Sequence, residues 1–360
     1  MEVKRGKDHI FVGMNFSLTR DRKLRITMQD YVEECIEVFK EAGGILEGRA
    51  NSPAKNGLFV VSEDAKELEE KEAEYFHHIV AKLLYVSKRA RLDIDLAISF
   101  LCTRVSKSTD EDWEKLRRLL LYLENTISMP RILGAERLDT VRTWVDASYG
   151  THQDMKGHTG GAMSMGTGVF NVKSTKQKLN TKSSTETEVV GVSDYLPWVV
   201  WTKSFMENQG RKIKSSILYQ DNESAIRIEK NGMKSCREKS RHIHIRYFFV
   251  TDLVKRKELS IKHCRSEKMV SDFYTKPLQG RLFRELRDFI MGVAPLPVEE
   301  RVGEQSSTEQ NSEMIKEKDR KDFGKTGVLN SVLRKSTDKG ATNKRVTYAD
   351  AVKTSRVETK

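Results

Sequence analysis

Four acidic residues in the second half of the chain occur where strands are expected to end or helices to begin. Asp146 follows the apolar run VRTWV, and Asp221 follows ILYQ. Glu188 lies in the first turns of the helix expected after residue 183, and Asp272 lies in EKMVSDFYTK, after LSIKHC. Acids at such positions of one α/β sheet can converge on its rim, where sites in open α/β sheets are usually found.

Clustered carboxylates repel one another unless cations neutralise them, and their hard oxygen atoms suit Mg²⁺ or Mn²⁺. Two such ions about 4 Å apart can activate a water and stabilise the leaving oxygen when a phosphodiester is cleaved. Taken singly, each acid is more simply read as a helix cap or a surface charge, and Asp221 stands where it could cap its own helix. The joint pattern, rather than any one member, predicts a two-metal site.

The stretch TKSSTETEVV contains two glutamates, each of which could take part in capping the helix that begins there. The helix-start pattern S/T-x-x-E fits in two registers, Ser183 with Glu186 and Thr185 with Glu188. In this pattern the hydroxyl accepts from a backbone N–H of the first turn, and the glutamate reaches back to the cap. One glutamate could therefore be a cap, which leaves the other free for chemistry.

The elements that must position these acids follow from hydrophobic patterning. A long helix is expected to run to about residue 209, with Pro197 kinking or dividing it. Around it the pattern predicts a strand at 141–150, a strand pair in the glycine-punctuated stretch 157–174, strands at 213–220 and 258–264, helices at 221–232, 241–257 and 283–291, and a helical turn at 267–276. Helices and strands that alternate in this way indicate a mixed α/β layer fold.

The first part of the chain, to about residue 138, is expected to be mostly helical. Its pattern predicts strands at 8–16 and 20–27, a helix at 27–44, one or two buried helices at 72–105 and an amphipathic helix at 110–125. Near the other end, residues 294–360 lose apolar periodicity and are polar, charged and poor in aromatic residues, so a disordered tail is expected.

The composition of the chain limits the kinds of protein that it could be. The 360 residues carry a formal net charge of +12, with 38% hydrophobic and 32% charged residues. So basic a chain suggests a polyanionic partner such as nucleic acid, although a solvated lysine-rich surface would give the same balance. The four cysteines form no C-x-x-C pair, which favours a reduced intracellular protein, cytoplasmic or nuclear, over a zinc protein. No run approaches the ~18 apolar residues that span a bilayer.

The motifs WVDASYG, GHTGGAMSMG, STKQKLNTKSSTETE, YQDNESAI, RHIHIRYFFV and SDFYTKPLQG occur in this order between residues 141 and 293. This segment resembles the ribonuclease H domain of Ty1/copia-type retrotransposon polyproteins. Residues 8–138 resemble the end of the reverse transcriptase and the connection of the same polyproteins. The resemblance implies a polyprotein fragment with a ribonuclease H-like mixed sheet and flanking helices at 139–293, preceded by a mostly helical, reverse-transcriptase-derived segment at 1–138.

The resemblance also assigns residues. It places the family's metal ligands, for two Mg²⁺ ions or Mn²⁺ in their place, at Asp146, Glu188, Asp221 and Asp272, with Asp146 bridging both ions. Glu186 is then left as the capping partner of Ser183. His263 stands where ribonucleases H carry a histidine that assists product release, although a histidine ending a strand is more often structural. Basic residues expected to contact nucleic-acid phosphates, or else to form a solvated face, are Lys173, Lys176, Lys178, Lys182, Arg241 and Arg246.

The implied activity is hydrolysis of the RNA strand of an RNA–DNA hybrid. The alternative is an inactive retroelement remnant that only binds nucleic acid, because the polymerase half is truncated. The chain has no Asp-Asp pair, so polymerase activity is not expected from it. An integrase of related fold would need a D-D-E arrangement with wide final spacing, and the motif order argues against this.

Overall fold

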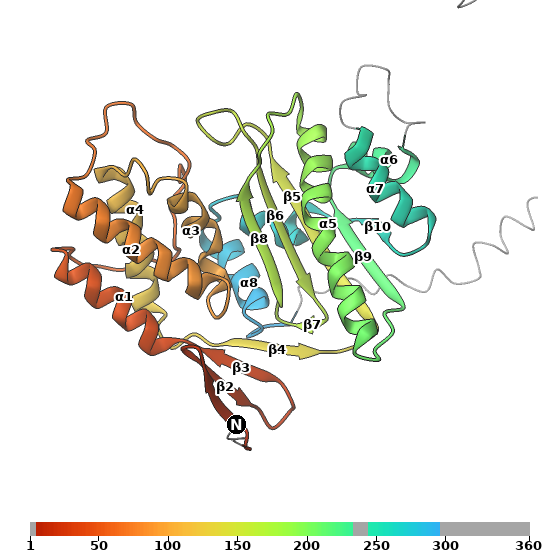
Figure 1. Ribbon diagram of the computed structural model, residues 1–360, viewed down its shortest axis with the longest axis horizontal. Coiled ribbons are helices and arrows are strands. Elements are labelled where there is room, and N and C mark those ends of the chain that lie inside the picture. Colours follow the sequence, from red (N-terminus) through yellow and green to blue (C-terminus); the bar gives the residue numbers. More distant parts are fainter. Residues whose placement is uncertain (1–4, 233–243, 296–360) are drawn as a thin grey trace, which may run out of the picture. The chain divides into compact units, whose positions relative to one another are not determined.

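A five-stranded mixed sheet forms the centre of the second half of the chain (Figure 1). The computed structural model describes residues 5–232 and 244–295, with side chains omitted for 244–247. Strands β5 (Thr140–Ser148), β6 (His158–Ser164) and β8 (Asn171–Lys176) are antiparallel neighbours. Strands β9 (Ser215–Gln220) and β10 (Ser260–His263) extend the sheet in parallel with β5, giving the order β10-β9-β5-β6-β8. The predicted ribonuclease H-like mixed sheet is confirmed.

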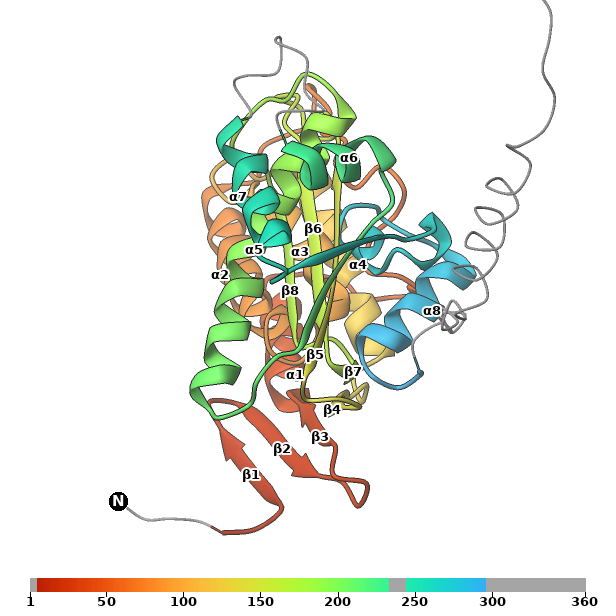
Figure 2. The same ribbon diagram turned by 90° about the vertical axis from the view of Figure 1, so that its right-hand side faces the viewer.

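Helices cover both faces of this main sheet. A Cβ on Gly161 of β6 would meet the ring of Tyr195 on helix α5 (Ser184–Asn208), whereas one on Gly160 would meet the backbone of Ser271 on the 3-10 helix η5 (Val270–Tyr274). Successive strand residues point to opposite faces, so α5 and η5 lie on opposite sides. Figure 2 shows the same separation for α5 and for helix α8 (Gly280–Ile290), which follows η5. Helices α6 (Glu223–Asn231) and α7 (His244–Lys255) pack against α5.

Helix α5 is continuous through Pro197, so of the two predicted effects of this proline, a kink or a division of the helix, the division is wrong. Pro197 and Trp198 are exposed, while Leu196 and Val199 on either side of them are buried in the core. Water can satisfy the carbonyl that proline leaves unpaired on the exposed face, and packing of the apolar face holds the helix together.

The first part of the chain contains the predicted helices and a second sheet. The helices are α1 (Gln29–Glu41), α2 (Glu70–Ser87), η1 (Leu92–Ile94), α3 (Asp95–Cys102) and α4 (Asp110–Asn125). The sheet has the order β1 (Asp8–Phe11), β2 (Met14–Leu18), β3 (Leu24–Thr27), β4 (Arg131–Ala135) and β7 (Gly166–Thr167). The strand expected at 8–16 is two strands, because Val12 and Gly13 adopt positive φ angles of 51° and 75° in a tight turn.

One hydrophobic core crosses the expected domain border at 138/139. It contains Ile36 and Leu119 from the helical part together with Trp144, Phe273 and Phe289 from the second half. Strand β4 pairs with β3 on one side and β7 on the other, so it links the two halves. All the described residues belong to a single compact unit. The border at 138/139 between the two predicted segments of the chain therefore stays a prediction. The tail predicted at 294–360 lies outside the described residues from residue 296 on.

Glu229, near the end of α6, should make folding stability depend on pH. Its side chain is fully buried, and burial raises the pKa of its carboxyl to about 8. The unfolded chain ionises near the ordinary value of 4.5, so the folded form holds the proton longer. The contribution of Glu229 to stability is then highest below about pH 4.5 and falls as pH rises towards 8, by up to several kcal/mol.

The variant Glu229→Gln has no such titration, and its melting temperature should rise relative to wild type between pH 5 and pH 8. Glu223→Gln on the same helix is the matched control, because Glu223 is exposed to water. Thermal melts at a series of pH values test this. A Glu229→Gln offset that is constant over the window would contradict it.

Candidate metal-binding site

Three of the four predicted acids meet at one edge of the main sheet. Asp146 is near the end of β5, Asp221 directly follows β9, and Glu188 lies in the second turn of α5. One carboxylate oxygen of each lies within 4.8 Å of the others. The convergence follows from topology, because β5 and β9 are parallel neighbours that end at the same edge, and α5 packs across β5.

Helix α5 can lie close enough to β5 because of a glycine. A Cβ on Gly191 would lie 2.9 Å from the Cβ of Ala147, nearer than side-chain carbons approach each other. Glu188, one turn earlier, is consequently pressed against the strand, where its Oε2 accepts from the backbone N–H of Ala147 at 3.0 Å. Gln220 also donates to this oxygen from Nε2, at 3.3 Å. These two donors fix one oxygen of the Glu188 carboxylate.

The fourth acid, Asp272, joins the site through a lysine. Lys276 Nζ lies 2.9 Å from Asp272 Oδ1 and 3.7 Å from Asp146 Oδ2. Asp146 also accepts a hydrogen bond from the Thr275 hydroxyl, and its side chain is only 4% exposed. Asp272 therefore lies near Asp146, with the ammonium of Lys276 close to both carboxylates.

The electrostatics of the site favour bound cations. Burial, and then the charges of Asp146 and Asp221, raise the pKa of Glu188 well above its ordinary range. Burial and the Asp146 charge also raise the pKa of Asp221, and they raise that of Asp272 to about 7. These shifts arise because the ionised carboxylates are short of water and of counter-charge. The all-oxygen donor set is the type that Mg²⁺ and Mn²⁺ prefer, so the residues present fit such ions.

The two neighbouring glutamates of α5 have different surroundings. Ser183 is the N-cap, and its Oγ accepts from the backbone N–H of Glu186 at 3.2 Å. The carboxylate of Glu186 accepts from the backbone N–H of Lys182 at 2.8 Å, one residue before the cap. Glu186 therefore closes the helix start, as predicted, while Glu188 points into the acid cluster.

The other predicted site residues are more dispersed. His263 is exposed at the end of β10, in register with Gln220, the residue before Asp221. Lys173 donates to the carbonyl of Asp194 at 2.9 Å, and Lys176 pairs with Asp154 at 2.9 Å, whereas Lys178 and Lys182 are exposed. Arg241 lies outside the described residues, and Arg246 lies in α7 without a described side chain. The nucleic-acid roles of these residues stay predictions.

Three side chains that lie close to the acids in the sequence also contact them, and the sequence analysis does not single them out. Gln220 orients Glu188 and, through Oε1, accepts from the backbone N–H groups of Asp221 and Asn222. Thr275 and Lys276 both contact Asp146. Their positions in the sequence could have pointed to them. Gln220 directly precedes Asp221, and Thr275 and Lys276 lie three and four residues after Asp272.

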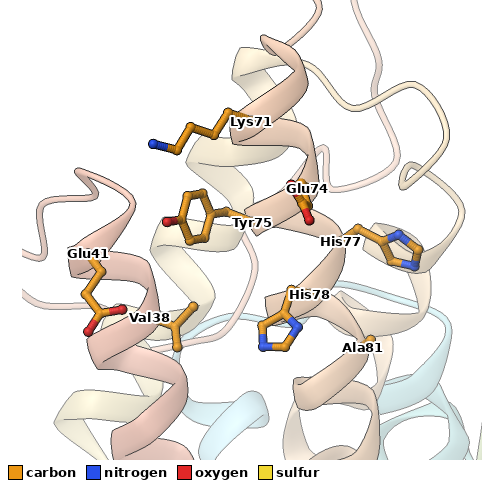
Figure 3. Close-up of a pocket in the computed structure, with 8 residues that line it drawn as sticks. All are labelled: Val38, Glu41, Lys71, Glu74, Tyr75, His77, His78 and Ala81. Carbon is orange, nitrogen blue, oxygen red and sulfur yellow. The ribbon is translucent and has the colours of Figure 1, made fainter.

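A separate groove of about 590 Å³ lies between α1 and α2 (Figure 3). Glu41 and Val38 face Tyr75 and His78 across it. It is built from helices of the first part of the chain, and none of the predicted site residues lines it.

No protein-family model matches the chain. A curated relative is the retrovirus-related Pol polyprotein from transposon TNT 1-94 of Nicotiana tabacum, 24% identical over 286 residues, which cover 78% of this chain and 21% of that protein. The Pol polyprotein from transposon RE1 of Arabidopsis thaliana is 28% identical over 62% of this chain and 15% of its own length. The Ty1-BR Gag-Pol polyprotein of Saccharomyces cerevisiae is 22% identical over 77% of this chain and 16% of its own length.

A solved structure, that of the foamy viral protease–reverse transcriptase in complex with an RNA/DNA hybrid, matches with a TM-score of 0.40 and 11% identity, over 76% of this chain and 31% of that one. The chain spans 15% to 21% of the length of the three curated relatives. In the part of the chain that the structure describes, no helix is long and apolar enough to cross a membrane. The chain is thus similar, over 62% to 78% of its length, to one section of retrotransposon Pol polyproteins.

Proposed function

We propose that this chain is a metal-dependent endonuclease that hydrolyses the RNA strand of RNA–DNA hybrids. The observation that carries the proposal is the convergence of Asp146, Glu188 and Asp221, with oxygens within 4.8 Å of one another. The raised pKa values of Glu188 and Asp221 support it, because a carboxylate cluster of this kind is stabilised by bound cations. The homology to Pol polyproteins is consistent with nucleic-acid chemistry.

The side chains of the site have different roles in holding the ions. Asp146, Glu188 and Asp221 would hold one divalent ion, and Asp146 with Asp272 would hold a second, so Asp146 serves both positions. When bound, two Mg²⁺ or Mn²⁺ ions supply an activated water and neutralise the leaving 3′ oxygen of a phosphodiester. Gln220 and the backbone N–H of Ala147 keep the Glu188 carboxylate in one orientation. Lys276 holds Asp146 and Asp272 close together before any ion binds.

Selection of the RNA strand requires contacts that read its 2′-hydroxyl groups. Affinity would come mainly from phosphate contacts by basic residues, as the net charge of +12 suggests. Lys178 and Lys182 are exposed just before the helix turn that carries Glu188, so they can contact the backbone near the cleaved bond.

Cleavage of a fluorescently labelled RNA–DNA hybrid by the full chain tests the proposal. We expect cutting of the RNA strand with Mg²⁺ or Mn²⁺, and none after EDTA is added. Duplex DNA of the same sequence is the control substrate and should stay intact. A folded sample that leaves the hybrid uncut in either metal, while a bacterial ribonuclease H cuts it, would refute the proposal.

One observation favours a second candidate, a remnant that only binds nucleic acid. The ammonium of Lys276 already neutralises part of the acid cluster, since it lies 2.9 Å from Asp272 and 3.7 Å from Asp146. A chain that needs no metal could keep this arrangement for stability alone. Binding to a hybrid without cutting in either metal would support the remnant.

A further inference from the structure

A cationic pocket of about 420 Å³ lies between the loop at residues 47–58 and helix α4. Five basic side chains line it: Arg49, Lys55, Lys115, Arg117 and Arg118. Its acidic lining residues are Glu47 and Glu114. The excess of positive charge makes the pocket suited to an anion. It is distinct from the acid cluster, because none of its lining residues contacts Asp146, Glu188 or Asp221.

Arg118 is the partly buried cation of this pocket that has no carboxylate partner within the described chain. Its Nη2 donates to Ser52 Oγ at 3.1 Å, while its buried Nε has no acceptor among the described residues. Burial lowers the pKa of its guanidinium. The adjacent Arg117 differs, because its Nε pairs with Glu114 at 2.9 Å. A guanidinium that is partly desolvated and unpaired costs free energy, which a bound anion would offset.

The pocket is hydrogen-bonded to the segment that carries the fourth acid. Gln279 Nε2 donates to the carbonyl of Ala54 at 2.7 Å, and Ser52 Oγ donates to Gln279 Oε1 at 2.8 Å. Ser52 is also the acceptor for Arg118. Gln279 is three residues after Lys276, so their Cα atoms are at most about 11 Å apart. A nucleic-acid strand advances about 3.4 Å per nucleotide along a duplex, so the step between Lys276 and Gln279 alone corresponds to at most about three nucleotides.

We propose that this pocket binds a backbone phosphate of the hybrid, away from the bond at the acid cluster. Arg118 is the principal ligand, because its planar fork can donate two hydrogen bonds to one phosphate. Lys55 and Arg49 are exposed and add positive charge at the mouth. The inference rests on the proposed function, since it takes the substrate of the acid cluster as the ligand.

Hybrid affinity measured against salt concentration tests the site. Fluorescence anisotropy in EDTA reports binding without cutting, with full-length wild type, Arg118→Met, Lys55→Ala and Arg137→Ala. Arg118→Met keeps much of the side-chain volume and removes the charge. Lys55→Ala is at an exposed position, so it still tests the pocket if Arg118→Met does not fold. Arg137, exposed before the start of β5, is the matched control.

We expect Arg118→Met to bind the hybrid about tenfold more weakly, the loss of one charged contact. The slope of log K against log salt should become shallower by about 0.9, the value for one phosphate. Lys55→Ala should shift the slope the same way, and Arg137→Ala should leave affinity and slope unchanged. Unchanged slopes in both Arg118→Met and Lys55→Ala would overturn the proposal.

Two further measurements, of thermal stability with small anions and of cleavage, separate the alternative outcomes. If inorganic phosphate or a mononucleotide raises the melting temperature of wild type but not of Arg118→Met, while hybrid slopes are equal, the pocket belongs to a small anion and the proposal fails. Cleavage is scored separately. If the wild type cuts the hybrid but all variants have the same salt slope, only the proposed phosphate pocket is refuted. If the wild type does not cut but Arg118→Met has a shallower salt slope, only the proposed nuclease activity is refuted.

Discussion

Asp146→Asn should abolish cutting of the hybrid while leaving its binding intact. Asn keeps the volume of the side chain and an oxygen that can accept from Thr275, so the fold around it is preserved. The charge that both proposed ion positions share is lost. An ion contributes several kcal/mol to stabilising a phosphoryl transition state, so its loss should slow cleavage at least about a thousandfold.

The control for Asp146→Asn is Asp252→Asn. Asp252 on α7 forms an exposed ion pair with Arg256, the residue after the helix, and such pairs contribute at most about 1 kcal/mol. Its loss should not affect cleavage. Initial rates with Mg²⁺, and anisotropy with the same hybrid in EDTA, measure the two properties for each variant. Equal cutting by Asp146→Asn and wild type would remove this carboxylate from the chemistry.

Stability gives a second, independent measurement on the same variant. In the metal-free protein, Asp146 repels Glu188, Asp221 and Asp272 and raises the pKa of each. Removing its charge relieves the repulsion, so Asp146→Asn should melt no lower than wild type without metal. It should also gain less from added Mg²⁺, because stabilisation by a ligand follows its affinity for the folded state.

The acid triad could be predicted because its signal is local. Asp146 and Asp221 each follow a run of apolar residues, and the pairing of β5 with β9 then places them at one edge. Glu188 could be told from Glu186 only by resemblance, since both helix-start registers fit the sequence. The structure separates them by direction, because residues two apart on a helix point to different sides.

Features made by contacts distant in sequence could not be predicted. Strand β4 was not predicted from the sequence, and it is stabilised by pairing with β3 on one side and β7 on the other. Thr275 and Lys276 stand in an irregular segment with no periodicity, and their contacts with Asp146 depend on how η5 packs across the sheet. Pro197 is a strong local signal against a helix, yet packing on both sides of it prevails.

Glu188→Gln and Glu186→Gln should differ sharply, although the two changes are chemically identical and two residues apart. At Glu188 the amide can still accept from Ala147 N–H, but it no longer carries the charge that would hold an ion. We expect a loss of about a hundredfold or more in cleavage rate, on the scale of a few kcal/mol for a ligand that orients an ion.

At Glu186 the amide oxygen can still accept from Lys182 N–H, so the helix start is kept. The variant loses the interaction of its charge with the helix N-terminus, about 0.3–1 kcal/mol of stability. Its cleavage rate should stay within about twofold of wild type, with a slightly lower melting temperature. Rates with Mg²⁺, paired with thermal melts, measure both variants. The opposite order, with Glu186→Gln inactive and Glu188→Gln active, would exchange the two roles and place the proposed metal ligand on the wrong side of α5.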